Sequence, residues 1–311
     1  MKRIVALLAS LALAGCGAEA HVAAQAPPSG TLYLAGMRPG EITKLDVARA
    51  RVTTRLLSEV SPGDPPFMVM ATDHGVVTFG HDSTYAFGSR LWEPARNLGG
   101  STYFVPSSTP GRLWLVLPQR RGVREVDSYG NVWFRHGARA PRWAITGAVD
   151  GGMLIQPDRG LAVWDPRTGR VVRRLPGTFP AATKGSSVAS CAFRCPVLHV
   201  TETRTGSDTA IRPHGFRFIE GYEGAYSPSG GLIAVPANGG RRVAIVNDDA
   251  GTASLLQGPR LAYPYSLLAW SSSGWLFYNA GNGRIAAWRP GSGRARLLPV
   301  RVPAFTDMSA D

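Results

Sequence analysis

Residues 231–247 read GLIAVPANGGRRVAIVN, which is two apolar segments on either side of the dipeptide Asn238-Gly239. An Asn-Gly pair readily adopts the positive φ angles of a two-residue turn, so between apolar segments it is a strong signal for a β-hairpin. The first segment starts with Gly231 and Leu232, and the second ends in Ile245-Val246-Asn247. Both boundaries recur along the chain, and their spacing predicts the fold.

A turn followed by a short apolar strand recurs at nearly constant intervals. The first apolar residues of these strands are Leu32, Val76, Leu113, Met153, Val197, Leu232 and Leu276. The six intervals average about 41 residues, close to the roughly 40–45 residues of one four-stranded β-propeller blade. After residue 20 no long stretch has the apolar period of an amphipathic helix.

A second marker follows the same period. Strands that run into a polar residue and a turn end at Asp46, Asp127, Asp165, Asn247 and Arg289, which are one or two periods apart. The hairpin signal Asn238-Gly239 is itself repeated 44 residues later as Asn282-Gly283. The repeat is therefore marked both where strands begin and where they end.

The C-terminus matches an internal segment. Residues 303–311, PAFTDMSAD, align without a gap to residues 65–73, PPFMVMATD, and share Pro, Phe, Met and Asp. In the second repeat this segment precedes the strand at Val76, whereas the first repeat begins directly at the strand of Leu32. We therefore expect the C-terminus to supply the missing first strand of the N-terminal blade, which closes the ring and covers edges that an open sheet exposes.

Three turns resemble those of known propellers. Residues 226–230, YSPSG, and 270–274, WSSSG, resemble an aromatic-Ser-Pro-Asp-Gly turn, and residues 164–169, WDPRTG, resemble a strand-ending turn of WD40 and quinoprotein blades. Over residues 31–311 the chain is thus similar to the WD40, YVTN and quinoprotein-like superfamilies. The resemblance implies an all-β fold with a single propeller of seven four-stranded blades. The spacing leaves rings of six or eight blades open, and two β-sandwiches or an irregular β-protein are the alternatives.

The N-terminus reads as an export signal. A basic start, Met1-Lys2-Arg3, precedes an uncharged apolar run over residues 4–14, which is shorter than the roughly 20 residues that span a bilayer. Residues 13–16, LAGC, then resemble the bacterial lipobox. That resemblance implies cleavage before Cys16 and lipid, such as palmitate, on its thiol.

These features divide the chain into three parts. We expect a lipoprotein signal peptide at residues 1–15, a flexible lipid-anchored tether at 16–29 and a propeller domain at 30–311. The implied location is exported and anchored at the cell membrane or cell surface, since two or three acyl chains hold a protein firmly on a membrane. An ordinary signal peptide with an incidental cysteine and an uncleaved anchor helix are the alternatives.

Cysteine usage fits an oxidising compartment. Cys191 and Cys195 are close in sequence, and in an exported protein such a pair is expected to form a local disulfide. Their spacing is one residue longer than the redox motif Cys-x-x-Cys. Two cysteines with the nearby His199 are too few for a structural zinc site, so no metal site is predicted.

The charge is strongly basic, with a formal net charge of +13. Arginine far outnumbers lysine, which occurs only as Lys2, Lys44 and Lys184, and arginine suits contacts to phosphate and carboxylate groups. A codon bias toward arginine explains the composition more simply, and the arginines are scattered without the tract of a nucleic-acid arm. We expect a monomer that contacts the membrane through its lipid and binds a protein or an anionic envelope polymer. We expect no nucleic-acid partner.

Candidate catalytic groups are few. His81-Asp82-Ser83 and Asp73-His74-Gly75 read as turns, because neighbours on a strand point to opposite faces, and Glu220 to Glu223 as a solvated loop. Tryptophans such as Trp114, Trp164 and Trp288 are expected to pack between blades. We therefore predict no catalytic residue and no cofactor, and a non-catalytic binding or interaction scaffold. The alternatives are a propeller-type enzyme, either a lyase or similar to quinone-dependent dehydrogenases, and an envelope-assembly factor.

Overall fold

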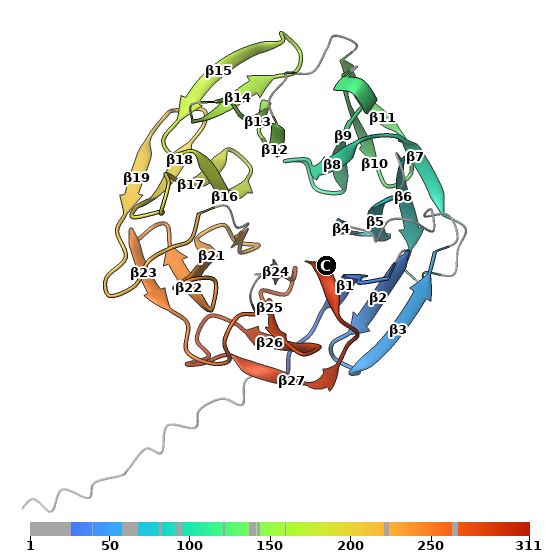
Figure 1. Cartoon of the computed structure of the whole chain (residues 1–311), viewed down its shortest axis with the longest axis vertical. Helices are drawn as coiled ribbons and strands as arrows, with labels where there is room; N and C mark the ends of the chain where they lie inside the picture. Colours follow the sequence, from blue (N-terminus) through green and yellow to red (C-terminus); the bar gives the residue numbers. More distant parts are fainter. Residues whose placement is uncertain are drawn as a thin grey trace, which may run out of the picture.

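The computed structural model describes residues 26–38, 40–57, 68–80, 83–89, 91, 95–120, 122–136, 141, 144–158, 160–220, 224–262 and 267–311. These residues form seven four-stranded antiparallel sheets, which surround a common axis as the blades of a propeller (Figure 1). The predicted all-β class and the seven blades are confirmed. None of the helices in these ranges is long and apolar enough to cross a bilayer.

The strands of each blade are given in order from the centre of the ring outward. Blade 1 is β28 (Phe305–Ala310), β1 (Thr31–Gly36), β2 (Glu41–Asp46) and β3 (Arg51–Leu56); blade 2 is β4 (Val69–Thr72), β5 (Gly75–Gly80), β6 (Ser83–Gly88) and β7 (Arg96–Gly100); blade 3 is β8 (Tyr103–Pro106), β9 (Arg112–Val116), β10 (Val123–Asp127) and β11 (Val132–His136), with the 3-10 helix η1 (Pro118–Arg120) between β9 and β10. Blade 4 is β12 (Ala144–Val149), β13 (Gly152–Gln156), β14 (Leu161–Asp165) and β15 (Arg170–Leu175); blade 5 is β16 (Phe179–Lys184), β17 (Ser187–Cys191), β18 (Leu198–Glu202) and β19 (Asp208–Ile211). Blade 6 is β20 (Ala225–Tyr226), β21 (Leu232–Ala237), β22 (Arg242–Asn247) and β23 (Thr252–Leu255); blade 7 is β24 (Leu268–Trp270), β25 (Leu276–Gly281), β26 (Arg284–Trp288) and β27 (Arg296–Arg301).

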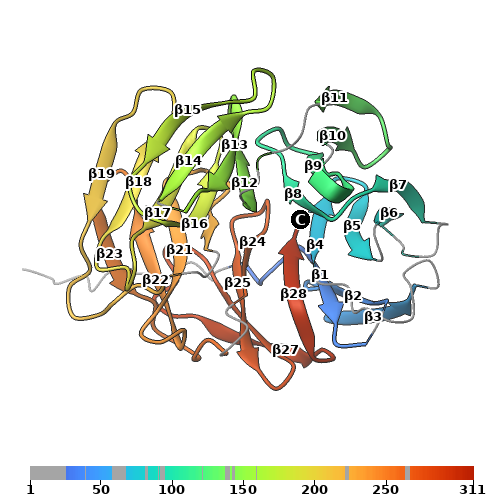
Figure 2. The same cartoon turned by 45° about the horizontal axis from the view of Figure 1, so that its top comes forward.

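The C-terminal strand closes the ring, as predicted. β28 pairs antiparallel with β1, with Leu34 opposite Met308, and Figure 2 shows the two strands side by side although they lie at opposite ends of the chain. Side chains of β28 also hold the next blade, because Asp307 Oδ2 accepts the Val69 N–H at 2.7 Å and Ser309 Oγ accepts the Ala71 N–H at 2.9 Å. Blade 1 is therefore completed by both ends of the chain.

The hydrophobic core lies between blades. Seven clusters of buried apolar side chains each join two neighbouring blades, and together they account for all seven interfaces of the ring. Trp114 and Trp164 are buried at the interface of blades 3 and 4, and Trp288 packs at that of blades 6 and 7. Burial of apolar area between sheets is thus the main stabilising contribution, as it is for stacked repeats in general.

The predicted pattern was wrong in one blade. The repeat places Val197 in the second strand of blade 5, but it directly precedes β18, the third strand, and the second strand is β17. β17 reads SVASC, whose small side chains give a weak apolar signal although Val188 and Ala189 are fully buried. Cys191 is consequently the last residue of β17, and Cys195 lies in the connection to β18.

The hairpin turns match their sequence signals. Asn238 and Gly239 have φ angles of 50° and 71°, and Asn282 and Gly283 have 53° and 68°, the positive values expected of such turns. The two aromatic-Ser turns are also equivalent, since the carbonyls of Ser227 and Ser271 accept the N–H of the glycine three residues on, at 2.9 and 3.0 Å. Local sequence therefore determines both connections in blades 6 and 7.

The ring has two distinct faces. Because paired strands alternate in direction, the turns after the first and third strands of every blade lie on one face, and the remaining connections lie on the other. Residues 26–30 join β1 on the first of these, which we call the N-terminal face; the other is the opposite face. On the N-terminal face the Ser29 carbonyl accepts the Ser273 hydroxyl at 3.1 Å, and the Val47 N–H donates to the Gly30 carbonyl at 3.1 Å.

Candidate functional site

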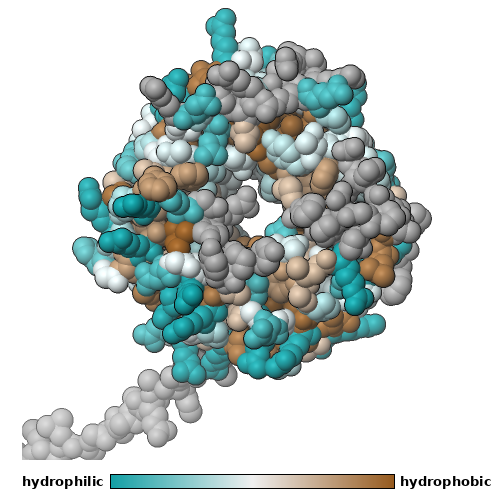
Figure 3. Space-filling model, viewed as in Figure 1, coloured by the Kyte–Doolittle hydropathy of each residue, from teal (hydrophilic) through white to brown (hydrophobic). Residues whose placement is uncertain are grey.

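A cavity of about 840 Å³ runs along the axis of the propeller, where all seven innermost strands contribute to its wall. The space-filling view shows the ring hollowed at its centre (Figure 3). A volume of this size is within the usual range for small-molecule sites. The described residues of this wall are therefore the first place to look for chemistry.

Most of the wall is small, aliphatic or hydroxylated. Its members include Ala71, Gly147, Ala182, Ala225, Ala269, Ala310, Met70, Met308, Thr72, Thr146, Thr183 and Ser309. Such residues keep the centre of a seven-bladed ring open, and they present hydroxyl groups rather than charges. Thr146 Oγ1 is buried without a partner among the described residues, so it is one hydroxyl that is not used by the fold.

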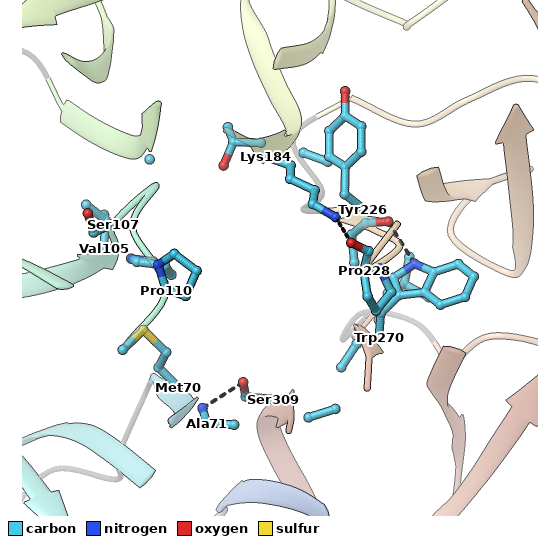
Figure 4. Close-up of a pocket in the computed structure, with 18 of the residues that line it drawn as sticks. Met70, Ala71, Val105, Ser107, Pro110, Lys184, Tyr226, Pro228, Trp270 and Ser309 are labelled. Carbon is cyan, nitrogen blue, oxygen red and sulfur yellow. Dashed lines mark hydrogen bonds between the residues drawn. The ribbon is translucent and has the colours of Figure 1, made fainter. Parts of the chain in front are cut away.

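Lys184 is the lysine of this cavity, at the end of β16 on the N-terminal face. Its ammonium donates to the Ser227 carbonyl at 2.7 Å and to the Pro228 carbonyl, and Figure 4 shows the side chain reaching across to the turn of blade 6. Partial burial lowers the pKa of the Lys184 ammonium. The charge therefore links two blades and is already bound by protein oxygens.

Arg112 lies at the rim of the cavity in blade 3, and its charge is likewise bound by protein groups. Its guanidinium lies 3.7 Å from the ring centroid of Trp133 and 3.8 Å from Glu125 Oε2. Glu125 also accepts the Ser107 hydroxyl at 2.6 Å. Both cationic side chains of the wall thus have structural partners within the fold.

The aromatic residues of the wall are structural as well. The Trp270 indole N–H donates to the Ala225 carbonyl at 2.9 Å, and the Tyr226 phenol points away from the cavity (Figure 4). Burial, together with the negative charges of Asp248 and Glu202, raises the pKa of Tyr226. Tyr226 therefore stays protonated over the whole physiological range.

The residues singled out in the sequence are dispersed over the molecule. Cys16 lies outside the described residues, as do His81 and Asp82. Asp73 and His74 form the turn between β4 and β5, as predicted, and Asp73 lies at the rim of the cavity. Glu220 lies in the connection between blades 5 and 6, and its Oε2 is buried without a partner among the described residues.

The expected disulfide is present, between Cys191 and Cys195 with Cα atoms 5.0 Å apart. It lies on the opposite face, away from the axial cavity, and its loop is short. In the part of the chain that the structure describes, no group of three or more His, Cys, Asp or Glu side chains is placed to hold a metal ion.

Sequence reasoning did not anticipate Lys184 or Arg112 as cavity residues. The scarcity of lysine was a usable signal for Lys184, because a residue type that the composition avoids needs a specific reason to be present. Arg112 carried no such signal among so many arginines. Its position depends on which strand faces the axis, and that follows from the ring.

Comparisons with known proteins identify a fold and no family. No protein-family model matches the chain, and no curated protein is similar to it in sequence. Among solved structures, apo AztD from Citrobacter koseri is similar with a TM-score of 0.50 and 13% identity, covering 92% of this chain and 98% of that one. The WD40 domain of Pan2 from Neurospora crassa is similar with a TM-score of 0.52 and 12% identity, covering 90% and 89%. These similarities show the propeller fold alone.

Proposed function

We propose that the chain is an exported lipoprotein, anchored by lipid on Cys16, whose propeller is a non-catalytic scaffold for a macromolecular partner. One observation carries the proposal: the chain joins the ring on the N-terminal face, next to the turn at Ser273. A lipid on Cys16 would hold this face toward the membrane. The opposite face would then be presented to the surroundings.

The length of the tether would keep the propeller close to the membrane. Thirteen residues, 17–29, separate Cys16 from Gly30, and they extend to at most about 45 Å and average roughly 20 Å as a flexible chain. Gly30 has φ = 127°, and a Cβ there would lie 3.0 Å from Ser271 Cβ, so this residue suits a close approach at the point of attachment. The propeller would therefore remain within about one molecular diameter of the membrane.

The chemistry of the cavity supports a scaffold over an enzyme. The Lys184 ammonium and the Arg112 guanidinium are each bound by protein groups, and the remaining wall is dominated by small and hydroxylated residues, with the carboxylates of Asp73 and Asp311. A general acid or base has to reach a substrate proton from a free position. The cationic groups here instead stabilise the ring.

The anchor is tested by a Cys16→Ser variant expressed in a bacterial host beside the unmodified protein. We expect the unmodified protein to take up a clickable palmitate analogue and to sediment with membranes, and the variant to do neither. Equal membrane association of both proteins would contradict the anchor. Turnover of a glycan, lactone or alcohol substrate by the purified protein would contradict the non-catalytic role.

A further inference from the structure

The two faces of the propeller differ in charge. On the N-terminal face, acidic residues occur in nearly every blade: Asp46, Asp73, Asp127, Asp150, Asp165, Glu202, Asp248, Asp249 and Asp311. On the opposite face, the described connections and the adjoining strand ends contain many exposed arginines: Arg38, Arg194, Arg212, Arg217, Arg241, Arg260, Arg284 and Arg301. The described acidic residues at the same positions are Asp158, the partly buried Glu220 and the buried Glu41 at the start of β2. The net positive charge of the protein is therefore concentrated on the opposite face.

Five of these arginines form a continuous group across blades 6 and 7, which we call the arginine arc: Arg217, Arg241, Arg260, Arg284 and Arg301. Backbone hydrogen bonds place its first three members together. The Asn238 N–H donates to the Arg217 carbonyl at 2.9 Å, and the Leu261 N–H, next to Arg260, donates to the Arg241 carbonyl at 3.0 Å.

Further backbone hydrogen bonds extend the arc into blade 7. The Ala262 N–H donates to the Asn279 carbonyl at 2.9 Å, which joins the connection that holds Arg260 to the hairpin that holds Arg284. The Val302 N–H donates to the Gly283 carbonyl at 2.9 Å, and Arg284 is the register partner of Arg301. The five arginines thus lie on a scaffold of linked turns and not on separate loops.

The arc is not neutralised by the residues that the structure describes. Its five side chains are exposed, and none forms an ion pair with another described residue. The segments that carry them, 211–219, 238–242, 256–262, 279–284 and 301–305, contain seven arginines and no Asp or Glu, and Glu220 directly follows the first of these segments. Like charges on directly opposed residues, such as Arg284 and Arg301, disfavour a sheet. The fold therefore retains a repulsive arrangement that an external anion would relieve.

We propose that the arginine arc binds a polymer with repeated phosphate or carboxylate groups. Each guanidinium can hold such a group through two parallel hydrogen bonds. A single exposed pair is weak, so useful affinity requires several anions on one chain, which engage successive arginines at high effective concentration. The choice of a polymer over the bilayer rests on the proposed function, because the anchor would turn the arc away from the membrane.

The test compares two variants of equal net charge in the full-length protein in detergent. The arc variant changes Arg217, Arg241, Arg260, Arg284 and Arg301 to Gln. The control variant changes five exposed arginines of the N-terminal face to Gln: Arg51, Arg167, Arg170, Arg294 and Arg296. Long-chain polyphosphate and a polyuronate serve as phosphate and carboxylate probes, with binding measured by fluorescence anisotropy over a range of salt concentrations.

We expect the arc variant to lose at least about tenfold in affinity and to show a shallower salt dependence, because each neutralised contact lowers the slope. The control variant should change less than about threefold. Equal losses in both variants would overturn the proposal, since they would reflect net charge alone. If circular dichroism shows that the variant with five substitutions is misfolded, a double variant, Arg241→Gln with Arg260→Gln, repeats the test with less disturbance of the fold.

Two outcomes separate this inference from the proposed function. Arc-dependent binding to vesicles with anionic lipid, with no binding to either polymer, would overturn the choice of a polymer. The Cys16→Ser fractionation tests the anchor and does not depend on the arc. Failure of the anchor with retained polymer binding would therefore refute the lipoprotein proposal and leave the arc as an anion-binding surface.

Discussion

Closure of the ring by β28 leads to a quantitative prediction for Phe305. Its side chain is 5% exposed and packs in the core cluster shared by blades 7 and 1. Replacing a buried Phe by Ala removes its burial and leaves a cavity, which costs about 3–5 kcal/mol. We expect Phe305→Ala to lower the free energy of unfolding by this amount in guanidinium denaturation followed by tryptophan fluorescence.

The matched control is Phe193→Ala, because Phe193 is the same residue type but 66% exposed. It should change the free energy of unfolding by less than about 0.5 kcal/mol. Deleting residues 303–311 removes both Phe305 and the buried Met308, so the loss should reach about 5–10 kcal/mol, comparable to the whole stability of a domain. A synthetic peptide of residues 303–311 should restore part of the melting temperature. Equal effects of the two Phe variants, or unchanged melting after the deletion, would refute closure by β28.

Three further predictions concern other parts of the molecule. Reduction of the Cys191–Cys195 bridge, or its replacement by two serines, should lower the free energy of unfolding by about 2 kcal/mol. The loop-entropy relation gives this small value because the closed loop has only five residues. Thermal melting with and without reductant measures the change. For Asp127, burial raises the pKa, but hydrogen bonds from two side-chain and two backbone N–H groups outweigh it and hold the pKa below the usual value. The contribution of Asp127 to the free energy of unfolding is therefore complete above about pH 4 and is lost as pH falls through the lower pKa of the folded state. Asp127→Asn should consequently make the free energy of unfolding fall less steeply at acid pH. Lys184→Met leaves two backbone carbonyls without their ammonium donor and should lower the free energy of unfolding by about 1–3 kcal/mol. Lys44→Met, which removes an exposed contact to one carbonyl, should cost less, and the reverse order in urea denaturation would argue against the inter-blade link.

Local signals in the sequence were sufficient for the architecture. The turns at Asn238-Gly239 and Asn282-Gly283 have the positive φ angles that their residues predict. A period of about 41 residues predicted the blades, because each blade is one chain-local unit of four strands. Even the closure was visible, since the C-terminal segment kept the pattern of an inner strand after a separation of nearly the whole chain.

Blade 5 shows where such signals fail. β17 is buried through Val188, Ala189, Ser190 and Cys191, yet its small residues give little hydrophobic contrast with the turns around it. The more apolar segment after Cys195 matches the repeat better, although it forms the third strand. A strand that is buried by its neighbours, and not by large side chains of its own, can be located only when those neighbours are in place.

The sequence by itself determined the blade repeat, the hairpin turns and the local disulfide, because these depend on residues close together in the chain. Only the tertiary structure decided which charges gather. Arg217, Arg241, Arg260, Arg284 and Arg301 are 17 to 24 residues apart and look scattered in the sequence. They form one surface because successive blades place equivalent connections on the same face. The roles of Lys184 and Arg112 at the cavity were likewise set by the ring, since only its closure turns the inner strands toward a common axis.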